Sequence, residues 1–201
     1  MQWDTPIYQL RPGTSRQLTT FCPETRQKTL RVEPHQTLTL AQTEETGVIT
    51  RLWLTFPGWF WQHWNPNAEI DSKLLRSVIL RIYFDGNAFP SVEAPIGDFF
   101  GVGHCEYRPY LSKFLGMSSG GFYSYFPMPF EKGIRIEAEN LHDSIPADIF
   151  LNANYQVLDH LESHTGRFHC QFQCGENPGS EPMDILCVDG TGHYVGCAIS
   201  M

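Results

Sequence analysis

Glu137 and Glu139 form the pair of side chains in this sequence that best fits acid–base chemistry. Residues i and i+2 of a strand project from the same face, roughly 7 Å apart after two strand rises. Carboxylate pairs that cleave glycosidic bonds are typically about 5 to 9.5 Å apart. The pair could therefore hydrolyse a glycoside, although alternating acids are also common on solvated strand faces, and Arg135 supplies a neighbouring opposite charge.

Two further acids, Asp98 and Glu93, lie in a turn-rich stretch that contains two prolines. An aspartate in such a turn commonly binds its own backbone, and ligand contact is the alternative for Asp98. Glu93 stands between Pro90 and Pro95, where an exposed edge position is the simpler interpretation. The candidate catalytic residues are Glu137, Glu139, Asp98 and Glu93.

Aromatic side chains supply the candidates for ligand binding. Trp59, Trp61 and Trp64 fall within twelve residues, 56–67, that carry too many aromatic rings for a plain turn. Such rings can stack on the C–H faces of sugars, and clustered tryptophans equally often anchor protein interfaces. The candidate ligand-binding residues are Trp53, Trp59, Trp61, Trp64, Asp98 and Tyr125.

The sequence predicts no metal and no cofactor. His169, Cys170 and Cys174 are ligand types for zinc, but on a strand His169 faces away from both cysteines, and no second ligand pair follows. Six cysteines at irregular spacing favour reduced thiols over disulfides, and Cys170, Cys174 and Cys187 fall in strand-like runs where buried thiols are expected.

Alternation of period two dominates the chain and predicts the strands that must position these residues. Inward faces are expected at Val78–Phe84, 133–140, 148–157 and 167–174, with further strands at 28–33, 36–42, 47–56, 183–189 and 193–200. A short helix is predicted at 69–77, and long aromatic loops at 56–67 and 95–121. About nine strands separated by turn residues indicate an all-β, antiparallel jelly-roll sandwich, in one domain over 1–201.

Charge and composition limit the partners. A net charge of −8 argues against nucleic acid and against anionic membranes, and a neutral ligand such as a saccharide fits better. The first residues contain no apolar run typical of a secretion signal or membrane span, so a cytoplasmic location is expected.

Three motifs give a resemblance to a known family: LRIYFDGNAFPSVEAPIGDFFGVG (80–103), GGFYSYFPMPFEKGIRIEAEN (120–140) and GTGHYVGCAIS (190–200). They resemble glycoside hydrolase family 172, over about residues 45–200, with 1–44 matching only weakly. The resemblance implies a jelly roll of the kind that occurs twice in those furanosidases, which assemble as trimers or multiples of trimers. It also implies that Asp85-Gly86 is a hairpin turn.

The family's glutamate motifs, Gly-Glu-Gly-Asp-Glu and Gly-Thr-Gly-Thr-Glu-Asp-Tyr, do not occur in this sequence. We therefore expect a non-catalytic or accessory module that self-assembles as a trimer or a multiple of it and for which a saccharide is the candidate ligand. It is either a natural single-jelly-roll relative, which we favour, or a piece of a longer double-jelly-roll enzyme. One alternative is an active furanosidase that uses acids of this chain or of a companion chain carrying the second jelly roll. The other, by analogy of fold, is a capsid-like structural protein.

Overall fold

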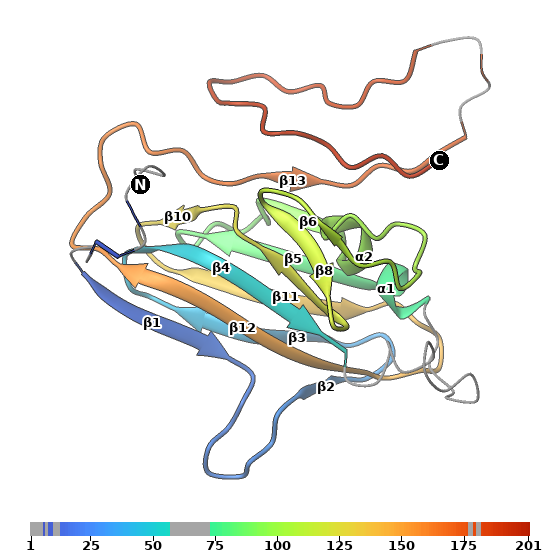
Figure 1. Ribbon diagram of the computed structural model, residues 1–201, viewed down its shortest axis with the longest axis horizontal. Coiled ribbons are helices and arrows are strands. Elements are labelled where there is room, and N and C mark those ends of the chain that lie inside the picture. Colours follow the sequence, from blue (N-terminus) through green and yellow to red (C-terminus); the bar gives the residue numbers. More distant parts are fainter. Residues whose placement is uncertain (1–5, 7, 10–12, 57–72, 177–178, 180–181) are drawn as a thin grey trace.

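The computed structural model describes residues 6, 8–9, 13–56, 73–176, 179 and 182–201. Two β-sheets pack face to face in this part of the chain, which confirms the predicted all-β sandwich (Figure 1). Both helices in it have four residues, so neither is long enough to cross a bilayer.

The elements follow one another in a simple order. The strands are β1 (Thr14–Thr19), β2 (Leu30–Val32), β3 (Thr37–Thr43), β4 (Gly47–Thr55), β5 (Val78–Phe84), β6 (Val92–Pro95), β7 (Tyr110–Leu111), β8 (Leu115–Ser118), β9 (Gly121–Ser124), β10 (Met128–Phe130), β11 (Ile134–Asn140), β12 (Ala147–Val157) and β13 (Cys170–Gln171). The helices are α1 (Leu74–Ser77) and α2 (Ile96–Phe99), and α1 overlaps the helix expected at 69–77.

The eight-stranded sheet has the order β1-β12-β4-β9-β8-β7, with β10 also pairing with β4 and β2 with β12. The five-stranded sheet has the order β13-β6-β5-β11-β3. All of these pairings are antiparallel except that of the short β13, which lies parallel to β6. Neighbours in each sheet are often distant in sequence, so side chains from remote segments meet on one face.

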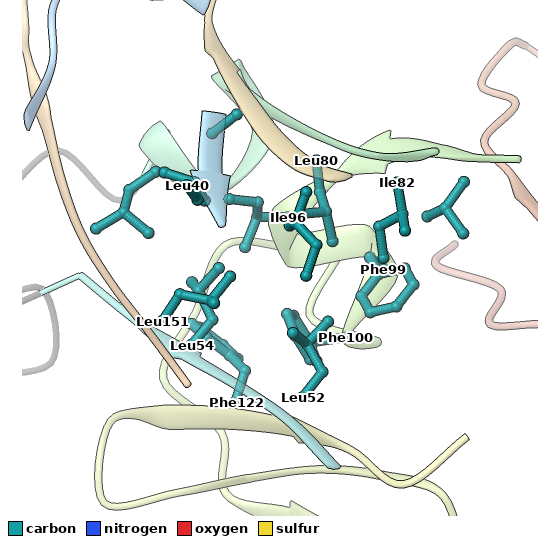
Figure 2. Packing of buried hydrophobic residues seen from close by; sticks show 14 of the residues in the cluster. Leu40, Leu52, Leu54, Leu80, Ile82, Ile96, Phe99, Phe100, Phe122 and Leu151 are labelled. Atoms are coloured by element: carbon teal, nitrogen blue, oxygen red, sulfur yellow. The ribbon is translucent and has the colours of Figure 1, made fainter. Parts of the chain in front are cut away.

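The core fills the space between the sheets (Figure 2). Val78, Leu80, Ile82 and Phe84 of β5 are all buried, and β11 and β12 bury alternate residues in the same way, as their alternation predicts. Phe100, which follows α2, stacks on Phe122 of β9 with ring centroids 5.4 Å apart, and so joins the helical turn to the opposite sheet.

The predicted hairpin turn at Asp85-Gly86 is confirmed. Both residues have positive φ, 58° and 73°, and the N–H of Asn87 donates to the carbonyl of Phe84. This is the twist that favours Asp-Gly at a tight connection between strands.

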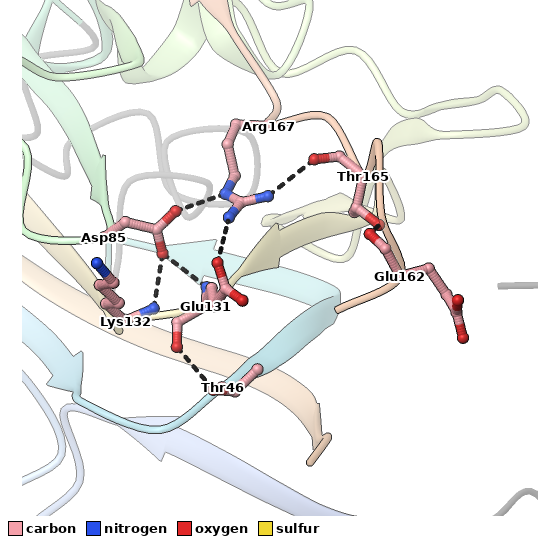
Figure 3. A network of polar contacts seen from close by, with 7 residues as sticks. All are labelled: Thr46, Asp85, Glu131, Lys132, Glu162, Thr165 and Arg167. Carbon is pink, nitrogen blue, oxygen red and sulfur yellow. Dashed lines mark hydrogen bonds and ion pairs between the residues drawn. The ribbon is translucent and has the colours of Figure 1, made fainter. Parts of the chain in front are cut away.

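The Asp85 carboxylate connects this turn to two other segments (Figure 3). It accepts hydrogen bonds from the backbone N–H groups of Glu131 and Lys132, at 2.6 and 2.8 Å, and Arg167 binds its other oxygen at 2.6 Å. Asp85 therefore holds the β10–β11 connection and the chain beyond β12 against the β5 hairpin.

The C-terminal strand predictions are wrong. Residues 183–189 and 193–200 are exposed and form no strand, and of 167–174 only Cys170–Gln171 forms a strand. Alternation alone does not make a strand, because a strand also needs a partner for its backbone groups.

The expectation of buried thiols is wrong for two of the three cysteines. All six cysteines carry thiols rather than disulfides, but Cys174 and Cys187 are exposed because their strands do not form. Cys170 is half-buried, and burial raises the pKa of its thiol to about 11.

Candidate functional site

The candidate acids Glu93 and Glu139 lie on the outer face of the five-stranded sheet, and a single arginine forms ion pairs with both. Arg81 of β5 binds Glu93 of β6 through Nε at 2.6 Å and Glu139 of β11 through Nη2 at 2.8 Å. The register explains both contacts. Arg81 stands directly opposite Glu93 of β6 and opposite Glu137 of β11, and Glu139 is the next residue of β11 on the same face, within diagonal reach of Arg81.

Glu137 belongs to a second ion pair on the same face. Its carboxylate lies 2.8 Å from Nε of Arg135, whose guanidinium also stacks over the ring of Tyr83 at 4.2 Å. Thr39 of β3 donates a hydrogen bond to the same carboxylate at 3.4 Å. Burial, followed by the charge of Glu137, raises the pKa of the Tyr83 phenol.

Glu137 and Glu139 do project from one face, as the strand spacing predicts, but each is bound to an arginine. A glycosidase pair requires one carboxyl group that donates a proton and one that is available to the sugar or to water. Each of these half-buried acids is paired with an arginine, and the arrangement favours a structural role for them.

Asp98 lies elsewhere, in α2, with its side chain 13% exposed. Burial raises the pKa of its carboxyl group, and Arg76, its own backbone N–H and His104 partly offset that effect. Arg76 of α1 lies 2.8 Å from Asp98 and also donates to the carbonyl of Gly103 at 3.0 Å. The guanidinium links α1 to α2, and the turn-forming role expected for Asp98 from the sequence stays a prediction.

The outer face of the eight-stranded sheet presents a different surface, made of aromatic rings. Trp53 of β4 stands opposite Tyr123 of β9, and the Trp53 ring meets Phe150 of β12 edge to face at 5.5 Å. Tyr125, just beyond β9, is 41% exposed and lies 5.3 Å from the Tyr123 ring. We call Trp53, Tyr123, Tyr125 and Phe150 the aromatic face.

Two glycines allow these rings to lie across the sheet instead of standing upright. A Cβ on Gly121 would lie only 2.4 Å from Nε1 of Trp53, and a Cβ on Gly116 only 2.2 Å from Cζ of Tyr123. The space that a side chain would take on β8 and β9 is thus filled by the rings of neighbouring strands. We call the Trp53 and Tyr123 rings, which cover these two glycines, the platform; the Phe150 ring stands nearly perpendicular to that of Trp53, at 82°.

Hydrogen-bonding groups border the platform on the β4, β12 and β1 side. Asn152 stands opposite Trp53, and Asn154 stands opposite Arg51 of β4. Nε2 of Gln17, from β1, donates to Oδ1 of Asn154 at 3.2 Å. The face therefore combines aromatic rings with amide groups and one guanidinium.

The structure describes only some of the ligand-binding candidates, and it does not bring all of these together. Trp53 and Tyr125 lie on the aromatic face, Asp98 lies in α2, and Trp59, Trp61 and Trp64 are outside the described residues. Tyr123 and Phe150 were not singled out from the sequence. The signal for Tyr123 was its alternation with Tyr125, but Phe150 needed the register of β12 against β4.

The segment Gly116–Gly120 has the Gly-x-Ser-x-Gly spacing of a hydrolase nucleophile turn. Here it forms the tight hairpin between β8 and β9, with Ser119 and Gly120 both at positive φ. That motif requires a helix directly after the serine, and β9 follows instead, so the spacing has no catalytic meaning in this fold.

No three of the described His, Cys, Asp and Glu side chains are grouped so that they could hold a metal ion. His169 is exposed next to the half-buried Cys170.

The comparison with protein families decides the relationship. The GH172 domain-like model matches residues 23–148, which is more than half of the chain. The chain belongs to this family. The GH172-like match contains the motifs at 80–103 and 120–140, and it supports a glycoside hydrolase-related module. No protein of curated function matches the sequence.

Proposed function

We propose that this GH172-like chain is a non-catalytic module that binds a saccharide on its aromatic face. The observation that carries the proposal is the placement of the Trp53 and Tyr123 rings over Gly121 and Gly116, next to amide side chains. Flat rings offer an apolar surface to the C–H faces of a sugar, and neighbouring amides can bind its hydroxyl groups.

Contacts with the two rings are enough for a weak affinity for a saccharide, even without a deep pocket. A sugar ring that covers one aromatic ring buries roughly 80 Å² of apolar surface, which is worth about 2 kcal/mol. Two rings and one or two hydrogen bonds add up to weak binding in the micromolar to millimolar range, which suits a module that attaches to a polymer.

The state of the acids supports the non-catalytic part of the proposal. Glu93 and Glu139 share Arg81, and Glu137 is bound to Arg135. Each of these three carboxylates thus has an arginine as its ion-pair partner.

The furanosidase alternative rests on Asp98, the candidate acid whose pKa is raised. A raised pKa fits a proton donor, but a hydrolase also needs a second carboxylate across the bond that is cleaved. Incubation with aryl α-arabinofuranoside and aryl fructofuranoside tests this alternative. Turnover that is lost in Asp98→Asn would establish it and refute the non-catalytic proposal.

Binding is tested by calorimetric titration with a fructo-oligosaccharide and an arabino-oligosaccharide. Trp53→Ala should weaken binding at least tenfold. Phe89→Ala is the matched control, because Phe89 is 83% exposed in the β5–β6 hairpin, away from the aromatic face, and its removal should leave binding unchanged. Equal losses in both variants would show that the ring over Gly121 has no special role.

A further inference from the structure

The strands of the eight-stranded sheet are basic, although the whole protein is acidic, with a net charge of −8. These strands contain three arginines, Arg16, Arg31 and Arg51, and a single acid, Asp148. Two of the arginines have ion-pair partners, since Arg16 lies 3.1 Å from Glu45 and Arg31 lies 3.9 Å from Asp148. The third, Arg51, is the one whose charge remains to be explained.

Arg51 lies on the aromatic face with its charge uncompensated. It is half-buried and precedes Trp53 by two residues on β4, so both side chains leave the same side of the strand. Its guanidinium forms no ion pair and no hydrogen bond with any of the described residues. Asp148 stands near the start of β12, about 20 Å along that strand from the residue facing Arg51, which exceeds the screening length of about 8 Å.

A neighbouring amide is oriented as a second donor. Asn154 stands opposite Arg51 on β12, and its Oδ1 accepts a hydrogen bond from Nε2 of Gln17 at 3.2 Å. Its Nδ2 therefore points away from Gln17, and its N–H groups bind no acceptor among the described residues. The guanidinium and this amide nitrogen offer donors without acceptors, which is the combination that binds an anion.

The spacing suits a sugar that carries an anionic group. Side chains two residues apart on a strand are roughly 7 Å apart, so a substituent of a sugar stacked on Trp53 comes within reach of the long Arg51 side chain. A guanidinium binds a carboxylate or a sulfate with two parallel hydrogen bonds, whereas a neutral sugar offers it only hydroxyl oxygens.

We infer that the saccharide bound on the aromatic face is acidic. Its ring stacks on Trp53, and its carboxylate or sulfate group binds Arg51 and Asn154. This inference rests on the proposed function, because it names the class of saccharide for the same face. The net charge of −8 does not oppose it, since the acids of the five-stranded sheet lie across a sandwich about 10 Å thick, beyond the screening length.

Titration calorimetry with matched pairs of oligosaccharides tests the inference. One pair is an oligogalacturonate and its methyl ester, and the other is a sulfated galactan oligosaccharide and its desulfated form. The wild type should bind the acidic member of at least one pair about fivefold tighter than the neutral member. Raising the salt concentration from about 10 mM to about 1 M should remove this preference, because exposed charges are then screened.

Arg51→Gln should bind the acidic and the neutral member of that pair equally, with the affinity for the neutral member unchanged. Arg135→Gln is the matched control, because it removes the same charge from the outer face of the opposite sheet, and it should keep the preference. Near-ultraviolet circular dichroism verifies that each variant is folded.

Equal affinity of the wild type for both members of every pair would overturn the inference and leave the proposed saccharide site in place. A preference that persists in Arg51→Gln would also overturn it, because another group would then bind the anion. Trp53→Ala should weaken the binding of acidic and neutral members alike, so wild-type affinity in that variant would refute the proposed function instead. Absence of binding to every member would refute both.

Discussion

Replacing Gly121 by alanine tests the aromatic face without removing any aromatic ring. The added Cβ would lie 2.4 Å from Nε1 of Trp53 and 2.7 Å from two carbons of its indole. Since atoms in contact normally lie about 3.5 to 4.0 Å apart, the indole must withdraw by roughly 1 Å. Gly121 is not among the glycines with positive φ, so alanine adds no backbone strain and the effect reports the ring displacement.

Two effects of different size are expected from Gly121→Ala. Overpacking costs about 1–3 kcal/mol of stability, which lowers the melting temperature by roughly 3–9 °C in a protein of this size. Displacing the platform removes most of the contact worth about 2 kcal/mol, which is roughly a thirtyfold loss of affinity for the oligosaccharide. Scanning calorimetry measures the first effect and titration calorimetry the second.

Gly166→Ala is the matched control, because nothing lies within 4 Å of the added Cβ. It should change neither the melting temperature nor the affinity by a measurable amount. If Gly121→Ala is destabilised but binds the oligosaccharide as tightly as the wild type, the ring over Gly121 is not the platform and the reasoning fails.

Three further predictions concern the polar contacts. In Asp85→Asn, asparagine tolerates the positive φ of this position but lacks the charge that binds Arg167. Urea denaturation at pH 7 should show a free energy of unfolding lower by about 1–3 kcal/mol. Burial raises the pKa of Asp85, but the backbone N–H groups and Arg167 together lower it by more, so the net pKa is below the usual value of 3.8. The stabilisation is therefore fully present above pH 3.8 and is lost as the pH falls through the lowered pKa. In acid the wild type and the variant should become equally stable. Tyr110 donates to the carbonyl of Phe100 and burial raises its pKa to about 12, so the wild type should lose stability between pH 10 and 12 and Tyr110→Phe should lack that loss; equal slopes would contradict it. Glu139→Gln should cost no more than about 1 kcal/mol and leave saccharide affinity unchanged, and a large loss of affinity would place the acids in the binding site.

The sequence predicted the sandwich because its alternation is strong where both sheets supply partners. β5 and β11 bury the residues expected of them. The same pattern at 183–189 and 193–200 predicted strands that do not form, since alternation says which face is apolar but not whether a neighbouring strand exists.

The candidate site was only partly predictable for a related reason. That Glu137 and Glu139 share a face follows from strand geometry, but Arg81 reaches Glu139 only through the register of β5 on β11. The role of Asp85 likewise depends on a connection 46 residues away in sequence. Contacts that depend on register between distant strands leave no local pattern, and such contacts decide whether an acid is available for chemistry.

Comparison of two variants in one binding titration tests the central claim most directly. Oligosaccharide affinity is measured for Trp53→Ala and for the triple variant Trp59→Ala, Trp61→Ala, Trp64→Ala, each checked for folding. The account predicts that Trp53→Ala loses binding at least tenfold and that the triple variant loses less. Wild-type affinity in Trp53→Ala, with binding lost in the triple variant, would contradict a saccharide site on the eight-stranded sheet.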